Sequence, residues 1–524
     1  MRKLRIACVF ALIAVTLATH AFAIGAQLRQ MSVTSDTTVS EFLDGLDWLS
    51  GSSHGAQSKK FSRITDIISQ SYYFGITREE LYQTITDGCL LRLPHNNIDY
   101  IYLLMFRALD KFSYYVPPVL SSPFEDPHYT GYGIVIYDTK RNKYSLTGEG
   151  LYIEEVYADS PAAQAGIQPH DKVISVNGIK VENLTLNALT TLLSSYGDTD
   201  DCTLTLERDN SLIEFTLHKK SIPSSELMTS FYPQYSTAKF DITAFSSSTL
   251  EGLFEQAVKQ TYEMGYKNII IDLRDNPGGV IDYAMNVTDT LITQEHNLFT
   301  FETKYDPYFM KYDSDKDGYS FEKIYVMVNE NTASASEAMT ISLKTLANAT
   351  VVGTKTYGKQ VGQVIHALED NSSFAVTTIK GYGPNGEDYN TVGIQPDYVI
   401  ANKPEEFKLP EGYLPLTVQQ LPLICDGGDH DAILALEQRF AVMNHLPDEY
   451  VDGVYDENLD ACIKIFQNLV GEENSQVSEK ILTYLDKSIE SYPGSISYPN
   501  DDQLDFVIDL ISGKIPEQSN AVQS

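Results

Sequence analysis

Two serines stand where an apolar run gives way to a helical pattern, in the stretch NENTASASEAMTISLK at residues 329–344. Ser334 would lie at the N-terminus of a helix, where backbone N–H groups have no partner inside the helix. These groups and the helix dipole can stabilise an oxyanion, so a serine at this point could act as a nucleophile. Serine is also a favoured N-cap, and taken alone the stretch favours that structural interpretation, without choosing between Ser334 and Ser336 as a nucleophile.

A lysine after the next apolar run is a candidate for the base that takes the serine proton. The strand-like residues 351–353 enter the turn TKTYGKQVGQ, which carries Lys355 and Lys359. A lysine that loses hydration has a lowered pKa, and its neutral amine can act as a general base. The alternative is a solvated charge in a loop. The nearest histidine downstream, His366, shows no recognisable pairing with the serines.

A third segment, DLRDNPGG at residues 272–279, follows a run of apolar residues that predicts a buried strand. Its diglycine, Gly278-Gly279, lets the backbone come close to a ligand with its N–H groups directed at it. That arrangement suits an oxyanion hole. A tight turn from strand to helix is the structural alternative.

The elements that must position these segments follow from the local patterns. Helical spacing predicts helices within residues 61–105, and short β-rich runs with one helical piece at residues 186–193 predict a small barrel-like domain over 128–220. Residues 221–425 alternate strands (268–273, 324–328) with helices (250–264, 280–292, and one opening near Ser334), which predicts an α/β unit with a largely parallel sheet. Helical patterns return after Asp426, with a last helix at 504–511.

Taken in chain order, the diglycine, serine and lysine segments together resemble the carboxyl-terminal processing peptidases, also called tail-specific proteases, which are Ser/Lys endopeptidases. In that family the nucleophile is the first serine of its motif and the lysine follows 25 positions later. The resemblance therefore selects Ser334 over Ser336 and Lys359 over Lys355. It also implies that Gln363, four residues after the lysine, orients the amine.

The resemblance covers roughly residues 61–425 and implies further features. The oxyanion hole would consist of backbone N–H groups of Gly278 or Gly279 and of Ala335. The fold would be multidomain α/β, with a crotonase/ClpP-like protease core, a helical N-terminal region (24–127), a PDZ domain and a helical C-terminal module. One departure is Thr345, where many members carry an acidic residue; we expect Ser, Lys and Gln to suffice without it.

The β-rich region at 128–220 is similar to the PDZ domain of these proteases. It contains SPAAQAGI at 160–167 and DKVISVNG at 171–178, with His170 in place of the usual glycine. The loop Gly131-Tyr132-Gly133-Ile134 resembles the carboxylate-binding loop, whose N–H groups can capture a peptide C-terminus while the adjacent strand edge pairs with the peptide. The alternative is a β domain used only for packing.

The remaining C-terminal sequence is less specific. Residues 426–490, with Asp452-Gly453 and Phe466-Gln467, resemble a small peptidoglycan-binding-like domain, although the usual second Asp-Gly is replaced by Glu472-Glu473-Asn474. An ordinary helical packing module is the equal alternative, and residues 491–524 read as a linker and helix. The pattern beginning at Asp313 imitates a calcium loop but lacks its glutamate at the twelfth position. We expect no metal and no cofactor.

Composition and the N-terminus place limits on partners and location. The formal net charge of −33 over 524 residues argues against nucleic acid as a partner. Residues 1–23 combine three cations, an apolar stretch and Ala21-Phe22-Ala23, which predicts a secretory signal peptide; an uncleaved anchor is the alternative. The widely spaced Cys89, Cys202, Cys425 and Cys462 could form disulfides in an oxidising compartment, but their spacing does not pair them.

These observations predict a secreted serine endopeptidase that takes protein C-termini through its PDZ domain and cleaves upstream with Ser334, Lys359 and Gln363. Its partners would be proteins or peptides with accessible C-termini, with peptidoglycan as a second candidate, and the oligomeric state stays open. A rival from another class is an inactive envelope scaffold on the same fold. A third reading is an esterase or amidase for small acyl substrates, which the PDZ domain disfavours.

Overall fold

The computed structural model describes residues 56–78, 80–81, 102–103, 105–106, 109–118, 128–139, 150–157, 160–223, 226–314, 317–425, 428–472, 476–492, 496–497 and 500–516. The predicted signal peptide, Cys89 and Asp315 of the calcium-like pattern lie outside these ranges. Contacts divide the chain into a first unit (residues 1–125, 295–315 and 358–393) and a second unit (126–294, 316–357 and 394–524). Within the described ranges, no helix combines the length and apolar character needed to cross a membrane. The domain boundaries expected from the sequence stay predictions.

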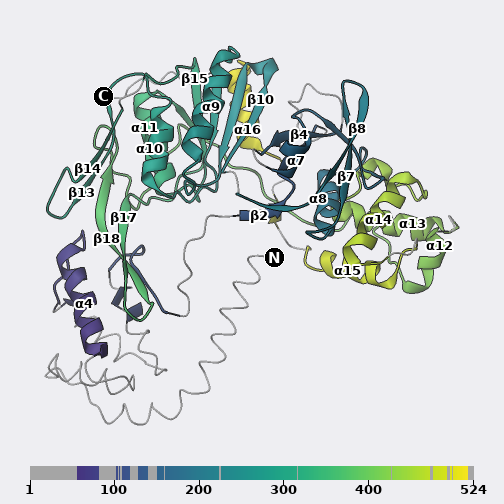
Figure 1. Ribbon diagram of the computed structural model, residues 1–524, viewed down its shortest axis with the longest axis horizontal. Coiled ribbons are helices and arrows are strands. Elements are labelled where there is room, and N and C mark those ends of the chain that lie inside the picture. Colours follow the sequence, from purple (N-terminus) through teal and green to yellow (C-terminus); the bar gives the residue numbers. More distant parts are fainter. Residues whose placement is uncertain are drawn as a thin grey trace, which may run out of the picture. The chain divides into compact units, whose positions relative to one another are not determined.

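The first unit is built on an antiparallel sheet (Figure 1). Its strands are β1 (Tyr114–Val116), β13 (Asn297–Thr303), β14 (Met310–Asp313), β17 (Val361–Ala367) and β18 (Ser373–Tyr382). Helix α4 (Ala56–Ser71) packs its apolar face, including Phe61 and Ile64, into a core that contains Phe374. This sheet was not predicted from the sequence. Its central strand β18 pairs with β1, so Tyr114 meets Ala375, and local periodicity carries no signal for such distant pairing.

The second unit contains the predicted α/β sheet. Its strands, in spatial order, are β10 (Leu227–Tyr232), β11 (Thr237–Ile242), β12 (Asn268–Asp272), β15 (Lys323–Val328), β16 (Thr350–Gly353) and β19 (Tyr398–Val399). Only the β10–β11 pair is antiparallel, and the others are parallel. The largely parallel sheet expected from the sequence is therefore confirmed. β12 and β15 are buried almost throughout, as strands covered on both faces must be.

Helices cover both faces of this sheet. Phe254 of α9 (Leu250–Glu263) packs edge-on against Phe240, on the face that also carries Ile271. Right-handed crossovers in a constant direction place α10 (Ile281–Asp289) and α11 (Ala335–Leu346) on that same face, and α10 contacts both other helices. The opposite face, which carries Ile270, is covered by α16 (Asp502–Ile511). The predicted helix at 280–292 is shorter than expected and ends at Asp289.

The predicted PDZ region is a β domain with two helices, also in the second unit. Its sheet has the order β3 (Ile134–Asp138), β4 (Leu151–Val156), β5 (Lys172–Val176), β7 (Cys202–Arg208) and β8 (Ser211–Leu217), with β6 (Ile179–Lys180) paired to β5. A separate pair joins β2 (His128–Gly131) to β9 (Lys220–Pro223). The helices are α7 (Pro161–Ala165) and α8 (Leu186–Ser195). The helical piece read from the sequence at 186–193 matches α8, and the region contains the short strands that the sequence predicted.

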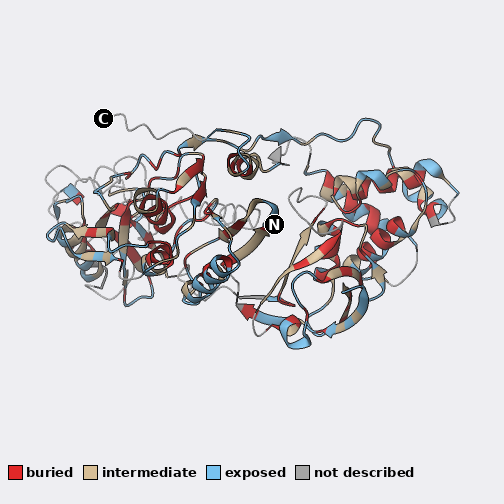
Figure 2. Cartoon of the chain, turned by 90° about the horizontal axis from the view of Figure 1, so that it is seen from above, coloured by how far each residue is buried: buried red, intermediate tan, exposed pale blue. Residues whose placement is uncertain are grey.

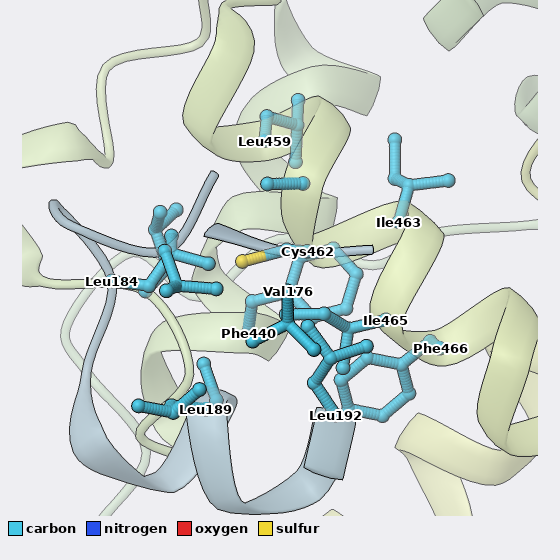
Figure 3. Packing of buried hydrophobic residues seen from close by; sticks show 14 of the residues in the cluster. Val176, Leu184, Leu189, Leu192, Phe440, Leu459, Cys462, Ile463, Ile465 and Phe466 are labelled. Atoms are coloured by element: carbon cyan, nitrogen blue, oxygen red, sulfur yellow. The ribbon is translucent and has the colours of Figure 1, made fainter. Parts of the chain in front are cut away.

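The C-terminal helices pack against this β domain. They are α12 (Leu421–Cys425), α13 (His430–Val442), α14 (Glu457–Val470) and α15 (Glu479–Ile489), and buried and exposed positions alternate around them (Figure 2). Figure 3 shows Leu189 and Leu192 of α8 among Phe440 of α13 and Phe466 of α14 in one continuous core. Cys202 and Cys462 belong to this core and both are free thiols. Helix α8 is thus held on one side by its own domain and on the other by the helical module.

A buried carboxylate, Glu437 of α13, holds the Asp452-Gly453 turn of this module. Its Oε2 accepts hydrogen bonds from the Asp452 and Gly453 N–H groups at 3.0 and 2.7 Å. Its Oε1 is buried without a hydrogen-bond partner in the described part of the chain. Burial, with a smaller contribution from the Asp452 and Asp456 charges, raises the pKa of Glu437 to about 7 against the opposing backbone hydrogen bonds.

We therefore expect the module to lose stability as pH rises. Because the folded pKa of Glu437 exceeds its unfolded value, the folded state binds the proton more tightly than the unfolded state does. Protonation of Glu437 therefore adds to the free energy of unfolding in full below about pH 4.5, and this stabilisation is lost as pH rises through 7. Glu437→Gln, which keeps an acceptor for the two N–H groups, should melt at a higher temperature than the wild type at pH 8 and show little difference at pH 5. Thermal unfolding at both pH values measures this. Glu490→Gln, at an exposed glutamate of the same module, is the control, and equal shifts in both variants would contradict the assignment.

Candidate active site

The turn between β15 and α11 places Ser334 at the N-cap of α11, as the sequence predicted. Ser334 has φ = 59° and ψ = −119°, a region that a residue with a side chain rarely adopts. Such a conformation costs of order 1–3 kcal/mol and persists only where its surroundings enforce it. On a sharp turn from strand to helix, this strain is what exposes a nucleophilic hydroxyl.

Buried contacts enforce the strained turn. Glu337, fully buried at the third position of α11, accepts a hydrogen bond from the Ser334 N–H at 3.0 Å and another from the Thr356 hydroxyl. The Thr332 hydroxyl donates to the Leu273 carbonyl at 2.8 Å. The serine turn is thereby tied to two neighbouring strand ends of the sheet.

The structure separates the roles of the two serines. Ser336 is fully buried, and its hydroxyl donates to the Asn276 carbonyl at 3.2 Å. Ser334 is only partly buried. A nucleophile has to reach its substrate, so Ser334 is the candidate and Ser336 serves the packing of the turn.

The diglycine turn lies directly against the serine turn. A Cβ added to Gly278 would stand 2.7 Å from the Ala333 carbonyl oxygen, 2.8 Å from Ser334 Cβ and 2.9 Å from Ala335 N. Gly278 also has φ = 96°, which only glycine adopts at low cost. The structure therefore brings together the predicted nucleophile and the predicted oxyanion segment, and glycine is required for that approach.

The three N–H groups predicted for an oxyanion hole differ in their bonding. Gly278 N–H donates to the Asn276 side-chain oxygen at 2.9 Å. The N–H groups of Gly279 and Ala335 find no acceptor among the described residues. Ala335 is the first residue of α11, where an unpaired N–H is expected. Gly279 and Ala335 are thus the donors that remain available to a ligand.

Asn276 is the residue that organises both turns, and the sequence analysis did not single it out. It is fully buried and its amide nitrogen donates to the Ile242 carbonyl at 2.8 Å. The backbone carbonyl of Asn276 accepts hydrogen bonds from the Ala333 N–H, at 3.0 Å, and from the Ser336 hydroxyl. Glu337 was also missed, although a glutamate three residues after an N-cap serine is a recognised capping signature.

Comparison with known sequences bears on this geometry directly. Residues 236–400, which contain both turns, match the model of peptidase family S41, and residues 123–207 match that of the PDZ domain. The chain thus contains an S41 peptidase domain. It is therefore a serine-type peptidase, and the β domain next to its catalytic domain in the sequence is a PDZ domain.

Relatives of the chain carry names of the same kind. A probable CtpA-like serine protease of Staphylococcus epidermidis is 26% identical over 82% of this chain and 84% of its own length. The carboxy-terminal processing protease CtpA of Bacillus subtilis is 28% identical over 70% of this chain and 75% of its own length. Among solved structures, the photosystem II D1 C-terminal processing protease is similar, with 21% identity, a TM-score of 0.40, and coverage of 66% of this chain and 93% of that one.

Lys359 of the peptidase lies in the first unit, in the loop before β17. Its side chain is half-buried, with Nζ 5.5 Å from the centre of the Phe112 ring. The backbone on either side is pinned: Gly358 O accepts from Thr391 N at 2.8 Å, and the buried Gln360 side chain exchanges hydrogen bonds with residues 387–389. Gln360 therefore sets the loop that carries the lysine, a role that the sequence did not indicate.

Gln363 lies on β17, in the same unit as Lys359. Its Nε2 donates to the Thr377 hydroxyl of β18 at 3.1 Å. Its Oε1 has no hydrogen-bond partner among the described residues, which leaves an acceptor for an ammonium group. The role of Gln363 in orienting Lys359 stays a prediction.

Thr345, at the position where the resemblance expects an acid, lies in the last turn of α11. Eleven residues of helix separate it from Ser334 along the axis by about 16 Å. A carboxylate at position 345 would therefore lie far from the Ser334 hydroxyl. The missing acid does not weaken the case for Ser334.

The predicted carboxylate-binding loop of the PDZ domain connects β2 to β3. Gly133 has φ = 79°, and a Cβ there would overlap the Ser160 side chain. β3 ends the order of its sheet, so one of its edges carries no strand among the described residues. The Tyr132 side chain is buried in the core, so Tyr132 could contribute only its backbone to a ligand. A peptide could pair with the edge of β3 beside α8.

Proposed function

We propose that this S41 peptidase is a secreted Ser/Lys endopeptidase that selects proteins by their C-termini through its PDZ domain. The observation that carries the proposal is the approach of Gly278 to Ser334 and Ala335 at the N-terminus of α11. A strained, partly exposed serine beside N–H groups without acceptors is the arrangement that acyl transfer requires. We also assign the α/β core to the crotonase/ClpP-like class, because the sequence resembles the carboxyl-terminal processing peptidases.

In the proposed reaction, the neutral amine of Lys359 takes the Ser334 proton as Oγ attacks the scissile carbonyl carbon. The N–H groups of Gly279 and Ala335 stabilise the tetrahedral oxyanion. Its collapse expels the amine, which receives the proton from Lys359, and leaves an acyl group on Ser334. Lys359 then deprotonates a water molecule that attacks the acyl carbon, and it returns this proton to Ser334 Oγ as the acyl–oxygen bond breaks.

Chain connectivity supports the assignment of Lys359. The Tyr357 N–H donates to the Thr332 carbonyl in the serine turn at 3.0 Å, and Lys359 follows Tyr357 by two residues. Lys355, the other lysine of the turn, is exposed. Gln363 would hold the amine in place through its Oε1.

Recognition of C-termini would use the 131–134 loop and the edge of β3. The N–H groups at residues 132 and 133 would bind the carboxylate, and β3 would pair with the peptide backbone. The predicted signal peptide at residues 1–23 supports secretion. Peptidoglycan as a further partner has no support from the helical module, since its Asp452-Gly453 turn binds Glu437.

We expect C-terminal amidation to lower cleavage of an unfolded protein substrate by about tenfold or more in kcat/KM, because charge-assisted hydrogen bonds to the carboxylate are lost. Matched free-acid and amidated substrates, with Ser334→Ala as the blank, measure this. A small acyl ester, which has no peptide C-terminus, is the control and should be hydrolysed at an unchanged rate when free C-terminal peptide is added as competitor. Equal cleavage of both protein substrates would rule out carboxylate recognition, and cleavage by Ser334→Ala would rule out the nucleophile.

A further inference from the structure

Arg274, in the turn between β12 and the diglycine, is held by two carboxylates at once. Its Nε and Nη2 donate to the two oxygens of Asp272 at 2.8 and 2.6 Å. Its Nη1 and Nη2 donate to the two oxygens of Asp501 at 2.6 and 2.8 Å. The Arg274 side chain is 15% exposed and that of Asp272 is 6% exposed, so the pair with Asp272 is largely shielded from water. Paired geometry of this kind fixes orientation as well as charge.

Asp501 comes from the far end of the chain, where it is the N-cap of α16 and accepts from the Leu504 N–H. The apolar face of α16, with Val507 and Ile508, packs on the sheet face that carries Ile270 and Tyr325. Hydrogen bonds also hold the N-terminus of α16 in place. The buried Gln503 accepts from Arg274 Nη1 at 3.2 Å and donates to the Ile400 carbonyl at 2.8 Å.

The residues next to Arg274 connect directly to the catalytic turns. The Leu273 carbonyl accepts the Thr332 hydroxyl, two residues before Ser334, and also the Asn276 N–H at 3.3 Å. Asn276 in turn holds Gly278 and the serine turn. Arg274 thus stands between the C-terminal helix and the backbone that presents Gly278 to Ser334.

The charge of Lys239 acts on Asp272 in addition to that of Arg274. Burial tends to raise the pKa of Asp272, but hydrogen bonds and charge from Arg274, with Lys239 nearby, outweigh it, so that the pKa is lowered. Asp272 therefore stays ionised and cannot release Arg274 by protonation near neutral pH. Asp501 is the more exposed of the two carboxylates that hold Arg274, since its side chain is 36% exposed and that of Asp272 is 6% exposed.

We propose that Asp501 is a positioning residue of the peptidase: it fixes Arg274, and through it the 273–276 turn, in the form that holds Gly278 against Ser334. The proposal rests on the proposed roles of Ser334 and Gly278. It assigns to the C-terminal helix a part in catalysis and not only in packing. Asp501 acts through Arg274 and does not touch the reacting atoms.

Asp501→Asn tests this, because asparagine is as good an N-cap as aspartate but lacks the charge for Arg274. We expect kcat for a short peptide substrate, per active site titrated with a fluorophosphonate, to fall about 5- to 30-fold with KM changed less than twofold. Asp501→Glu, which restores the charge, should recover at least half of the lost rate. Asp502→Asn is the matched control, since Asp502 is the next residue in the same helix turn but pairs with Lys403, and its kcat should stay within twofold of wild type.

The outcomes distinguish the possibilities. An unchanged kcat in Asp501→Asn, or an equal loss in Asp502→Asn, overturns the positioning role. A lower melting temperature with normal kcat in the titrated Asp501→Asn enzyme shows that Asp501 only stabilises the fold, and this too overturns it. A wild type that is not acylated at Ser334 overturns the proposed function and this proposal with it, whereas an active wild type with an unaffected Asp501→Asn overturns this proposal alone.

Discussion

Ser334→Ala is expected to lower proteolysis by at least about 10⁴-fold, because loss of the nucleophile leaves only the oxyanion donors and substrate binding. The variant should also fail to react with a fluorophosphonate. Ser336→Ala is the matched control: its hydroxyl is buried and bonded to the Asn276 carbonyl, so we expect a loss of less than about tenfold. Initial rates on an unfolded protein substrate and intact-mass measurement of labelling provide both readouts.

The same experiment extends to the base. Lys359→Ala should lose activity to a similar extent, while Lys355→Ala, at the exposed lysine of the same turn, should stay close to wild type. Because the amine must be neutral to accept the proton, the wild-type rate should rise with pH and be weak in acid. Labelling of Ser336 in place of Ser334, or full activity in Lys359→Ala, would refute the Ser/Lys assignment.

Gly278→Ala is expected to reduce kcat by about 10²–10³-fold, because the added methyl would displace the donors Gly279 and Ala335, and loss of one oxyanion donor has an effect of this size. The added methyl would stand within 3 Å of Ala333 O, Ser334 Cβ and Ala335 N, so the two turns must move apart. Two of these three atoms belong to the backbone, which cannot yield as a flexible side chain would. The measurement is kcat on a short peptide substrate, together with thermal unfolding to confirm that the variant is folded.

A matched control separates this clash from the cost of a side chain at positive φ. Gly265, which follows α9 in the same unit, has φ = 77° and no atom within 4 Å of an added Cβ. Gly265→Ala therefore carries the conformational penalty without the clash, and we expect it to lower the melting temperature slightly and leave kcat near wild type. Similar kcat values for the two variants would show that the approach of Gly278 to Ser334 does not matter for catalysis.

Much of the candidate site could be predicted because its signals are local. The strand that ends at Asp272, the turn with two glycines and the helix that opens at Ser334 each follow from hydrophobic periodicity and turn chemistry within about ten residues. The resemblance to the peptidase family, through its spacing of 25 residues, then selected Ser334 from the two serines and Lys359 from the two lysines. The antiparallel sheet of the first unit was missed because β1 and β18 are distant in sequence.

Residue types and their spacing are enough to predict which chemical groups are present, their order and the type of element that carries each of them. The folded chain was needed to show which serine is accessible, which N–H groups lack an acceptor, and that Gly278 lies against Ser334. It also brought Asp501 to Arg274 across 227 residues. The physical reason is that burial and contacts between distant segments arise from packing onto both faces of one sheet, and local periodicity carries no record of those partners.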